Sequence, residues 1–130
     1  MRRWIPWAAA LTLLGACGGP TSPADGPAGA YHLRSVDGQR VPYRIVDRPG
    51  VEILDRRVVL EPVGSFSDVL SFRVQVGQET VVLPRIRTGT YAGAPPGITL
   101  TLDSGREMRA AVAGGILVLD DRGVIFRLAR

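Results

Sequence analysis

The chain has 130 residues, of which 45% are hydrophobic and 22% are charged, and its formal net charge is +4 at pH 7. This length suffices for one domain with a modest core and leaves little room for a second domain. All the basic residues are arginines, and they are spread along the chain rather than gathered in one run, which argues against nucleic acid as a partner.

The first residues have the layout of a bacterial lipoprotein signal. Two arginines precede an apolar run over 4–14, which is too short to span a bilayer because a spanning helix needs about 20 residues. The sequence LGAC follows at 14–17, where small residues precede the only cysteine of the chain. We therefore predict a signal peptide over 1–16 and lipidation of the Cys17 thiol, with palmitate as an acyl group. An ordinary secretory signal, cleaved after a small residue, is the closest alternative.

Residues 17–28 have the composition of a flexible tether. Glycine, proline, serine and threonine dominate, and nothing in this stretch can bury apolar surface. Gly18 directly follows Cys17, at the position where an aspartate retains lipoproteins in the inner membrane of bacteria with two membranes. We therefore expect a lipid-anchored protein of the cell envelope that is placed at the outer membrane.

Turn signals divide residues 29–130 into short segments. Most of them recur about 8 to 14 residues apart, which is the spacing of short antiparallel strands joined by hairpins. Every one contains glycine, which adopts the positive φ angles of tight turns without strain. The turn signals are Asp37-Gly38, Pro49-Gly50, Val63-Gly64, Gly77-Gln78, Pro95-Pro96-Gly97, Ser104-Gly105, Gly114-Gly115 and Arg122-Gly123.

Between the turns, apolar and polar residues alternate with a period of two, which indicates strands with one buried face. No stretch shows a convincing 3.6-residue periodicity, so little helix is expected. We predict that Leu70, Phe72, Leu100 and Phe126 face inward and pack in the core. The alternating apolar sets are Val58 and Leu60; Leu70, Phe72, Val74 and Val76; Ile98, Leu100 and Leu102; Met108, Ala110 and Val112; and Val124, Phe126 and Leu128.

Two stretches do not alternate clearly. Residues 80–86 are apolar on both faces, so no inward face is assigned to them. Residues 41–55 are irregular, and Pro42 and Pro49 within them indicate an edge strand or a covering loop.

Four stretches resemble small lipocalin-like domains of bacterial lipoproteins. They are GAYHLRSVDGQRVP at 29–42, GSFS at 64–67, GTY at 89–91 and GVIFR at 123–127. The resemblance implies an all-β fold over 29–130, a single antiparallel up-and-down meander of about eight strands that forms a small lipocalin-like barrel. The residues that carry the resemblance are turn glycines and core aromatics. The resemblance therefore implies no activity and no functional residue. Tyr31 and Tyr91, each two residues after a glycine, are expected to cap one end of the barrel.

Residues that could carry chemistry are few. His32 is the only histidine and is expected to face solvent, since Tyr31 beside it faces inward. No nucleophile-elbow motif is present to supply a nucleophile for it. With Cys17 lipidated, carboxylates would be the main metal ligands, and the densest pair, Asp120-Asp121, lies in a turn where aspartate is common. We therefore expect no enzymatic activity, no metal and no cofactor.

Two pairs of arginines, Arg56-Arg57 and Arg85/Arg87, lie within strand segments. They could contact a phosphate or a lipid headgroup, because a guanidinium binds such groups well. A solvated strand face or strand end is the simpler expectation for both pairs.

Glu61 and Asp68 are the best candidates for a polar group near a barrel mouth. Asp68 shares the strand face of Leu70 and Phe72. If it is buried there, it must be paired or protonated, and arginine is the natural partner. More often such a residue lies at the open end of its strand and is solvated.

Two classes of function fit these features. The first is binding of a small apolar ligand, because an eight-stranded barrel can hold one if side chains do not fill its interior. The second is a structural or interaction protein whose filled barrel binds an envelope protein through its outer face. An apolar cavity of about 300 Å³ or more would favour the first class. For both classes we expect a monomer that reaches the membrane through its lipid anchor.

Overall fold

The structure is a computed structural model that describes residues 26–130. The predicted signal peptide over 1–16, Cys17 and most of the tether over 17–28 lie outside the described residues. The last tether residues contact the C-terminus, because the guanidinium of Arg130 donates hydrogen bonds to the carbonyl oxygens of Gly26 at 3.0 Å and Ala28 at 2.7 Å.

Residues 26–130 form nine β-strands and no helix, and every predicted turn falls at the junction between two strands. This part of the chain therefore has no helix that is long and apolar enough to cross a membrane. The strands are β1 (Gly29–Val36), β2 (Tyr43–Arg44), β3 (Val51–Leu60), β4 (Ser65–Val76), β5 (Glu79–Ala92), β6 (Gly97–Leu102), β7 (Glu107–Ala113), β8 (Ile116–Asp121) and β9 (Val124–Ala129).

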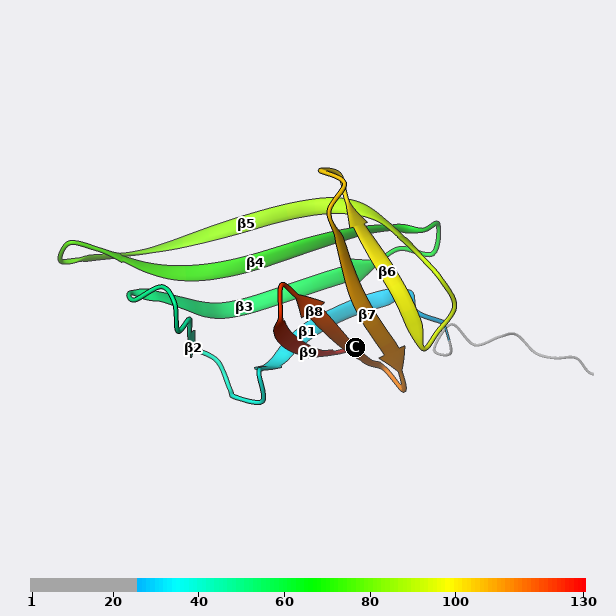
Figure 1. The fold of residues 1–130 in the computed structure, drawn as a ribbon, viewed down its shortest axis with the longest axis horizontal. Coiled ribbons are helices and arrows are strands. Elements are labelled where there is room, and N and C mark those ends of the chain that lie inside the picture. The colour runs from blue at the N-terminus through cyan, green and yellow to red at the C-terminus, as the bar shows by residue number, and fades with distance from the viewer. Residues whose placement is uncertain (1–25) are drawn as a thin grey trace, which may run out of the picture.

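The strands form one antiparallel sheet that closes on itself (Figure 1). Consecutive strands pair from β3 to β9, β9 pairs with β1, and β1 closes the ring by pairing with β3, with Tyr31 opposite Val58. The short β2 pairs with β3 further along, with Tyr43 opposite Ile53. The predicted meander that closes into a small eight-stranded barrel is thus confirmed, and it is compatible with a lipocalin-like barrel. The strand pairings lie within 29–129, so this part of the chain carries a complete barrel.

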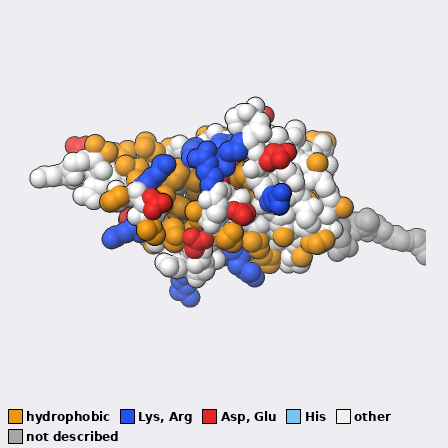
Figure 2. Space-filling view, viewed as in Figure 1, with side chains coloured by type: hydrophobic (Ala, Val, Ile, Leu, Met, Phe, Trp, Pro, Cys, Tyr) orange, Lys and Arg blue, Asp and Glu red, His pale blue; other side chains and the backbone are white. Residues whose placement is uncertain are grey.

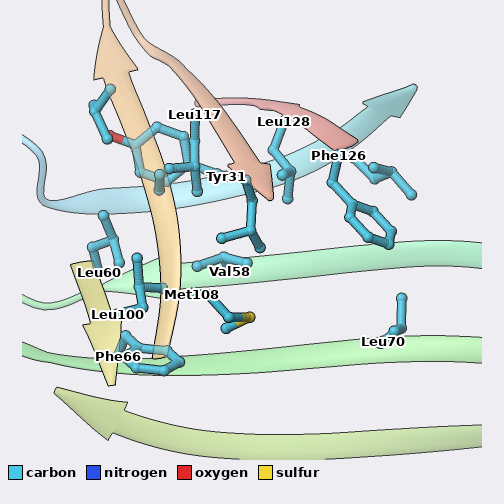
Figure 3. Close-up of a cluster of buried hydrophobic side chains, with 14 of the residues drawn as sticks. Tyr31, Val58, Leu60, Phe66, Leu70, Leu100, Met108, Leu117, Phe126 and Leu128 are labelled. Carbon is cyan, nitrogen blue, oxygen red and sulfur yellow. The ribbon is translucent and has the colours of Figure 1, made fainter. Parts of the chain in front are cut away.

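The inward faces of the barrel strands meet in one core (Figure 3). Leu70, Leu100 and Phe126 are buried, as predicted. Phe72 packs against the same core from the predicted face but is only half-buried. The other buried apolar residues are Tyr31, Leu33, Val36, Ile53, Val58, Leu60, Phe66, Ile98, Leu102, Met108, Ala110, Val112, Leu117, Leu119 and Leu128.

Two tyrosines cap one end of the barrel, as predicted. Tyr31 is fully buried, and its hydroxyl donates a hydrogen bond to the carbonyl oxygen of Pro27 at 2.7 Å. The hydroxyl of Tyr91 donates to the carbonyl oxygen of Glu61 at 2.6 Å. The side chain of Glu61 is exposed beside this capped end, in the β3–β4 turn. We refer to this end as the closed end.

A β-bulge in β3 lets residues on both sides of it face inward. The register with β4 shifts between Ile53 and Asp55. Ile53 is buried before the bulge, and Arg56 and Val58 are buried after it. Because a bulge inserts one extra residue into a strand, the odd-numbered inward face changes to an even-numbered one at this point.

The β4–β5 hairpin is longer than the barrel and projects beyond it (Figure 1). β5 pairs with β4 over residues 79–90 but with β6 only over 89–92. Within the described part of the chain, residues 79–87 therefore have no strand partner on the side away from β4. Both faces of this segment are accessible, and hydrophobic side chains are exposed along the projecting hairpin (Figure 2). Residues 80–86 are thus apolar on both faces without being enclosed by the barrel.

Gly89 lies where β6 approaches β5 closely. A Cβ atom at this position would lie 2.0 Å from the carbonyl oxygen of Thr101 and 2.8 Å from the ring of Phe66. We expect Gly89→Ala to lower the free energy of unfolding by about 3 kcal/mol, because a backbone atom of a paired strand cannot move aside cheaply. Gly97→Ala is the matched control, since no atom lies within 4 Å of its added Cβ. Urea titration should separate the two variants, and equal losses would contradict this steric account.

Candidate functional site

Five charged side chains, from four strands and one turn, meet inside the barrel. They are Arg56 of β3, Asp68 of β4, Arg87 of β5, Arg106 of the β6–β7 turn and Asp121 of β8, and we call them the charge cluster. Arg56 and Asp68 are fully buried, and Asp121 is nearly so. Barrel closure brings β8 opposite β3, β4 and β5, so residues far apart in the sequence become neighbours.

Arg56 and Asp68 form a bidentate ion pair. The Nε atom of Arg56 donates to one carboxylate oxygen of Asp68 at 2.9 Å, and its Nη2 atom donates to the other oxygen at 2.7 Å. The same Nη2 atom lies 3.1 Å from a carboxylate oxygen of Asp121. Asp68 is therefore buried and paired with an arginine, rather than solvated at the open end of its strand as is more common for such a residue.

Arg87 and Arg106 complete the charge cluster. The Nη2 atom of Arg87 donates to Asp68 at 2.9 Å and to Asp121 at 3.0 Å. The Nη2 atom of Arg106 donates to the other carboxylate oxygen of Asp121 at 3.1 Å. Three arginines against two aspartates leave the cluster with one excess positive charge. Within residues 26–130, the Nη1 atom of Arg56 and the Nε atom of Arg87 are buried without a hydrogen-bond partner.

Apolar side chains enclose the charge cluster. The guanidinium carbon of Arg56 lies 4.3 Å from the centroid of the Phe126 ring, which is a cation–π geometry. The sulfur of Met108 lies 3.9 Å from the Nη2 atoms of both Arg56 and Arg87. The cluster thus lies in a medium of low polarity, where ion pairs are strong but an unpaired charge is costly.

The end of the barrel opposite the closed end holds a pocket of about 320 Å³, which we call the mouth pocket. Residues 43–48, from β2 and the loop after it, cover one side, so the predicted edge strand or covering loop is confirmed for this segment. Asp121 of the charge cluster lines the pocket, and so does Phe126, whose ring contacts Arg56, so the cluster lies at the inner side of the pocket. Apolar residues that line the pocket include Ile45, Ile53, Leu70, Phe72, Val124 and Phe126.

The arginine pairs do not share one environment. Arg57 is exposed on the outer face of β3, as expected, and Arg85 is exposed on the inner face of β5, opposite Leu70. Arg56 is fully buried and Arg87 is mostly buried, so the expectation of a solvated face is wrong for these two. Their strand faces explain the difference, because Arg56 shares the inward face of Val58 and can reach a buried carboxylate.

The remaining predicted positions divide between surface and interior. His32 is exposed on the outer face of β1, as predicted. Asp120 accepts a hydrogen bond from the amide of Gly123 at 2.9 Å, which is a turn role. Asp121 is buried in the charge cluster, so the expectation that it serves only the turn is wrong. Among residues 26–130, no group of three potential metal-ligating side chains comes together.

The charge cluster should make stability depend on pH below pH 4. Burial alone would raise the pKa of Asp121, but the nearby arginines outweigh burial and lower that pKa from 3.8 to about 2. A lowered pKa in the folded state contributes stability that is present above the unfolded value and is lost as the pH falls through the folded value. We expect a loss of about 2 kcal/mol from this group between pH 4 and pH 2.

Urea titrations of residues 26–130 at several pH values measure this loss. Asp121→Asn removes the titrating group, so the variant should be less stable at pH 7 and should lose less stability on acidification. An acid dependence as steep in Asp121→Asn as in the parent would show that other carboxylates cause it.

Comparison with known proteins finds no family model, no curated protein and no solved structure that matches this chain. The fold and the site define a small closed antiparallel β-barrel with a packed core, a buried charge cluster and a pocket at its mouth.

Proposed function

We propose that this protein is a non-catalytic, lipid-anchored protein of the cell envelope that binds one small, largely apolar ligand in the mouth pocket. The observation that carries the proposal is the division of the barrel interior. The core fills the closed end, the charge cluster follows it, and the remaining space is a mostly apolar pocket of about 320 Å³. Pockets of this size and lining are typical of small-molecule sites.

The surroundings of the pocket support binding rather than catalysis. His32 is exposed on the outer face of β1 and does not line the pocket. Asp121, which does line it, is held by three arginines. A carboxylate that is paired in this way and has a lowered pKa is a poor general base near pH 7.

A neutral fluorescent dye, N-phenyl-1-naphthylamine, tests the proposed binding. Its emission rises in apolar surroundings, and it should bind to residues 26–130 with a stoichiometry of one. Val124→Trp should abolish this binding, because Val124 is half-buried and lines the pocket. Ile125→Trp is the matched control, since Ile125 is the next residue and is 39% exposed outside the pocket. No binding by the parent, or equal binding by both variants, would refute the proposal.

The proposed location rests on the sequence LGAC at 14–17 and on the tether that follows it. The match of the lipoprotein pattern to Cys17 supports acylation of this thiol, and Gly18 supports placement at the outer membrane. Metabolic labelling with an alkyne analogue of palmitate should mark the parent protein, and Cys17→Ala should abolish the label because this is the only cysteine. Label that persists in the variant would refute the anchor.

A second candidate function is binding of an envelope protein through β5. The hairpin exposes Val82 by 59% and Ile86 by 67% on its outer face, and the edge of β5 beside them lacks a strand partner among the described residues. An unpaired edge with apolar flanks can accept a strand from another protein. Pro84 in the middle of this edge lacks an amide donor, so any added strand forms its hydrogen bonds on either side of this residue.

Site-specific photocrosslinking in cells tests this second candidate. A photoreactive side chain at Ile86 should capture one defined protein, and the same group at Arg57 on the outer face of β3 should not. Introducing Val82→Asp should remove the crosslink at Ile86 without unfolding the barrel. If Ile86 and Arg57 gave the same pattern of products, the capture would be unspecific and the candidate would fail.

A further inference from the structure

The inner face of the β4–β5 hairpin changes from charged to apolar along its length. The cross-strand pairs, taken outward from the charge cluster, are Asp68–Arg87, Leu70–Arg85, Phe72–Leu83 and Val74–Val81. The first pair belongs to the charge cluster, and the next two pairs contribute residues to the mouth pocket. The inner end of the pocket is therefore charged, with Asp121 of the charge cluster and Arg85 in its lining, and the wall toward the projecting hairpin is apolar.

Three arginines line the mouth pocket without a carboxylate partner. They are Arg48 in the covering loop, Arg85 on β5 and Arg122 in the β8–β9 turn. Among the ion pairs formed within residues 26–130, none includes any of these three. Their charges are thus available to a ligand in the pocket.

The aspartates that line the pocket do not neutralise these arginines. Asp121 is already shared among the three arginines of the charge cluster. Asp37 accepts hydrogen bonds from the Tyr43 hydroxyl at 2.9 Å and from the Ile125 amide at 2.8 Å. Asp47, at the rim, is the remaining acidic group of the lining. The lining and the cluster together hold six arginines against four aspartates, so the site has excess positive charge.

Arg85 is the best placed of the three to meet a ligand inside the pocket. It lies on the inner face of β5 opposite Leu70, one cross-strand pair away from the charge cluster. Its guanidinium carbon lies 5.8 Å from the centroid of the Phe72 ring, so the charged group lies beside an aromatic wall. Partial burial, followed by the positive charge of Arg87, lowers the pKa of Arg85. An anion beside Arg85 would raise this pKa again and so offset the effects of burial and of Arg87.

We infer that the ligand of the mouth pocket is an anionic amphiphile, an apolar molecule with one carboxylate, sulfonate or phosphate group, and that Arg85 binds the anionic group. The inference rests on the proposed ligand-binding function. A guanidinium suits these groups because its donors match two anionic oxygens at once. The apolar wall of the pocket then contacts the body of the ligand.

The charge gradient also sets the orientation of the ligand. The anionic group lies at Arg85, near the charge cluster, and the apolar body extends past Phe72 toward the hairpin. Leu83 and Val81 continue this wall beyond the pocket, and they are 48% and 37% exposed. A longer apolar body therefore covers side chains that are otherwise in water, which favours its binding.

Two dyes with the same aromatic frame test the charge requirement. Anilinonaphthalene sulfonate carries an anionic group, and N-phenyl-1-naphthylamine is its neutral counterpart. We expect the sulfonate to bind at least tenfold more tightly to residues 26–130, since hydrogen bonds to charged groups exceed the 1.4 kcal/mol that tenfold requires. Binding of the neutral dye alone would uphold the proposed function and overturn the inference. Binding of neither dye would overturn both.

Variants of Arg85 test the residue assignment. Arg85→Met should remove most of the preference for the sulfonate while leaving binding of the neutral dye within about twofold, because only the charge is lost. Arg85→Lys should keep part of the preference. Arg57→Met is the matched control, as Arg57 is an exposed arginine on the outer face of β3. If Arg85→Met and Arg57→Met kept the same preference as the parent, Arg85 would not bind the anionic group.

A chain-length series tests the orientation. Fatty carboxylates of 8 and 16 carbons are compared by their displacement of the sulfonate dye. Leu83→Ser should weaken the longer carboxylate several-fold and leave the shorter one unchanged. Val82→Ser is the control, because Val82 is the next residue on the opposite face of β5 and is 59% exposed. Equal effects of the two substitutions on the longer carboxylate would overturn the head-first orientation.

Discussion

Asp68→Ala should lower the free energy of unfolding by about 3–5 kcal/mol, because it leaves a fully buried guanidinium without its bidentate partner. Asp68 accepts both hydrogen bonds of Arg56, at 2.9 and 2.7 Å, and one from Arg87 at 2.9 Å. Without it, three arginines would share the single carboxylate of Asp121. Urea titration of residues 26–130 at pH 7 measures the loss.

Two further variants show whether the loss comes from the unpaired charge. Asp55→Ala removes an exposed carboxylate of β3 and should cost about 0.5 kcal/mol or less. The double variant Arg56→Met/Asp68→Leu removes both charges and should be more stable than Asp68→Ala, since apolar side chains of similar size can replace a buried ion pair. A loss below about 1 kcal/mol for Asp68→Ala would mean that water reaches the charge cluster. The cluster would then not close the inner side of the pocket.

Phe126→Ala should bring the barrel close to unfolding. Truncating a packed phenylalanine costs about 3–5 kcal/mol, which is a large share of the stability of so small a domain. Phe126 is 3% exposed, supports the guanidinium of Arg56 at 4.3 Å and forms part of the pocket wall. The variant should therefore also lose the dye binding that the pocket provides.

Arg127→Ala is the control for Phe126→Ala. Arg127 is the next residue of β9 and is exposed on the outer face. Its truncation should lower the free energy of unfolding by less than about 1 kcal/mol. Thermal and urea unfolding of both variants compare the two faces of one strand. If Phe126→Ala remained within about 1 kcal/mol of the parent, Phe126 would not be a core residue.

Much of the barrel could be predicted from alternation and turn residues. Leu100 and Phe126 lie in strands of six residues with turns at both ends, so one face had to be buried and the pattern identified it. The residues of 80–86 could not be assigned because they lie on a hairpin that leaves the barrel, where both faces meet solvent. The alternation within one strand does not show where the neighbouring strand of the sheet ends.

The charge cluster was only partly predictable, although a signal for it exists. Arg56 shares the face of Val58, and Asp121 shares the face of Leu119, so strand alternation puts both on an inward face, as it does Asp68. A solvated position is nevertheless the simpler expectation for both, because charged residues are rarely buried. Their mutual pairing could not be predicted, because the closure that brings β8 opposite β3 depends on the register of the whole ring.

The charge cluster explains why the barrel divides into a packed half and a pocket. Five ionic side chains occupy the cross-section where further apolar residues could have extended the core. They hold β3, β4, β5 and β8 together from inside and place excess positive charge at the inner side of the pocket. The same residues thus stabilise the barrel and favour an anionic group in the ligand.

Methyl-detected NMR of residues 26–130, titrated with anilinonaphthalene sulfonate, tests the proposed site most directly. The isoleucine, leucine and valine methyls report every part of the barrel. We expect shifts at Ile53, Leu70 and Val124, which line the mouth pocket, and none at Leu117, which is fully buried in the core. Shifts confined to Val82 and Ile86 on the outer face of β5, with Leu70 and Val124 unchanged, would contradict the pocket and favour the partner-binding surface.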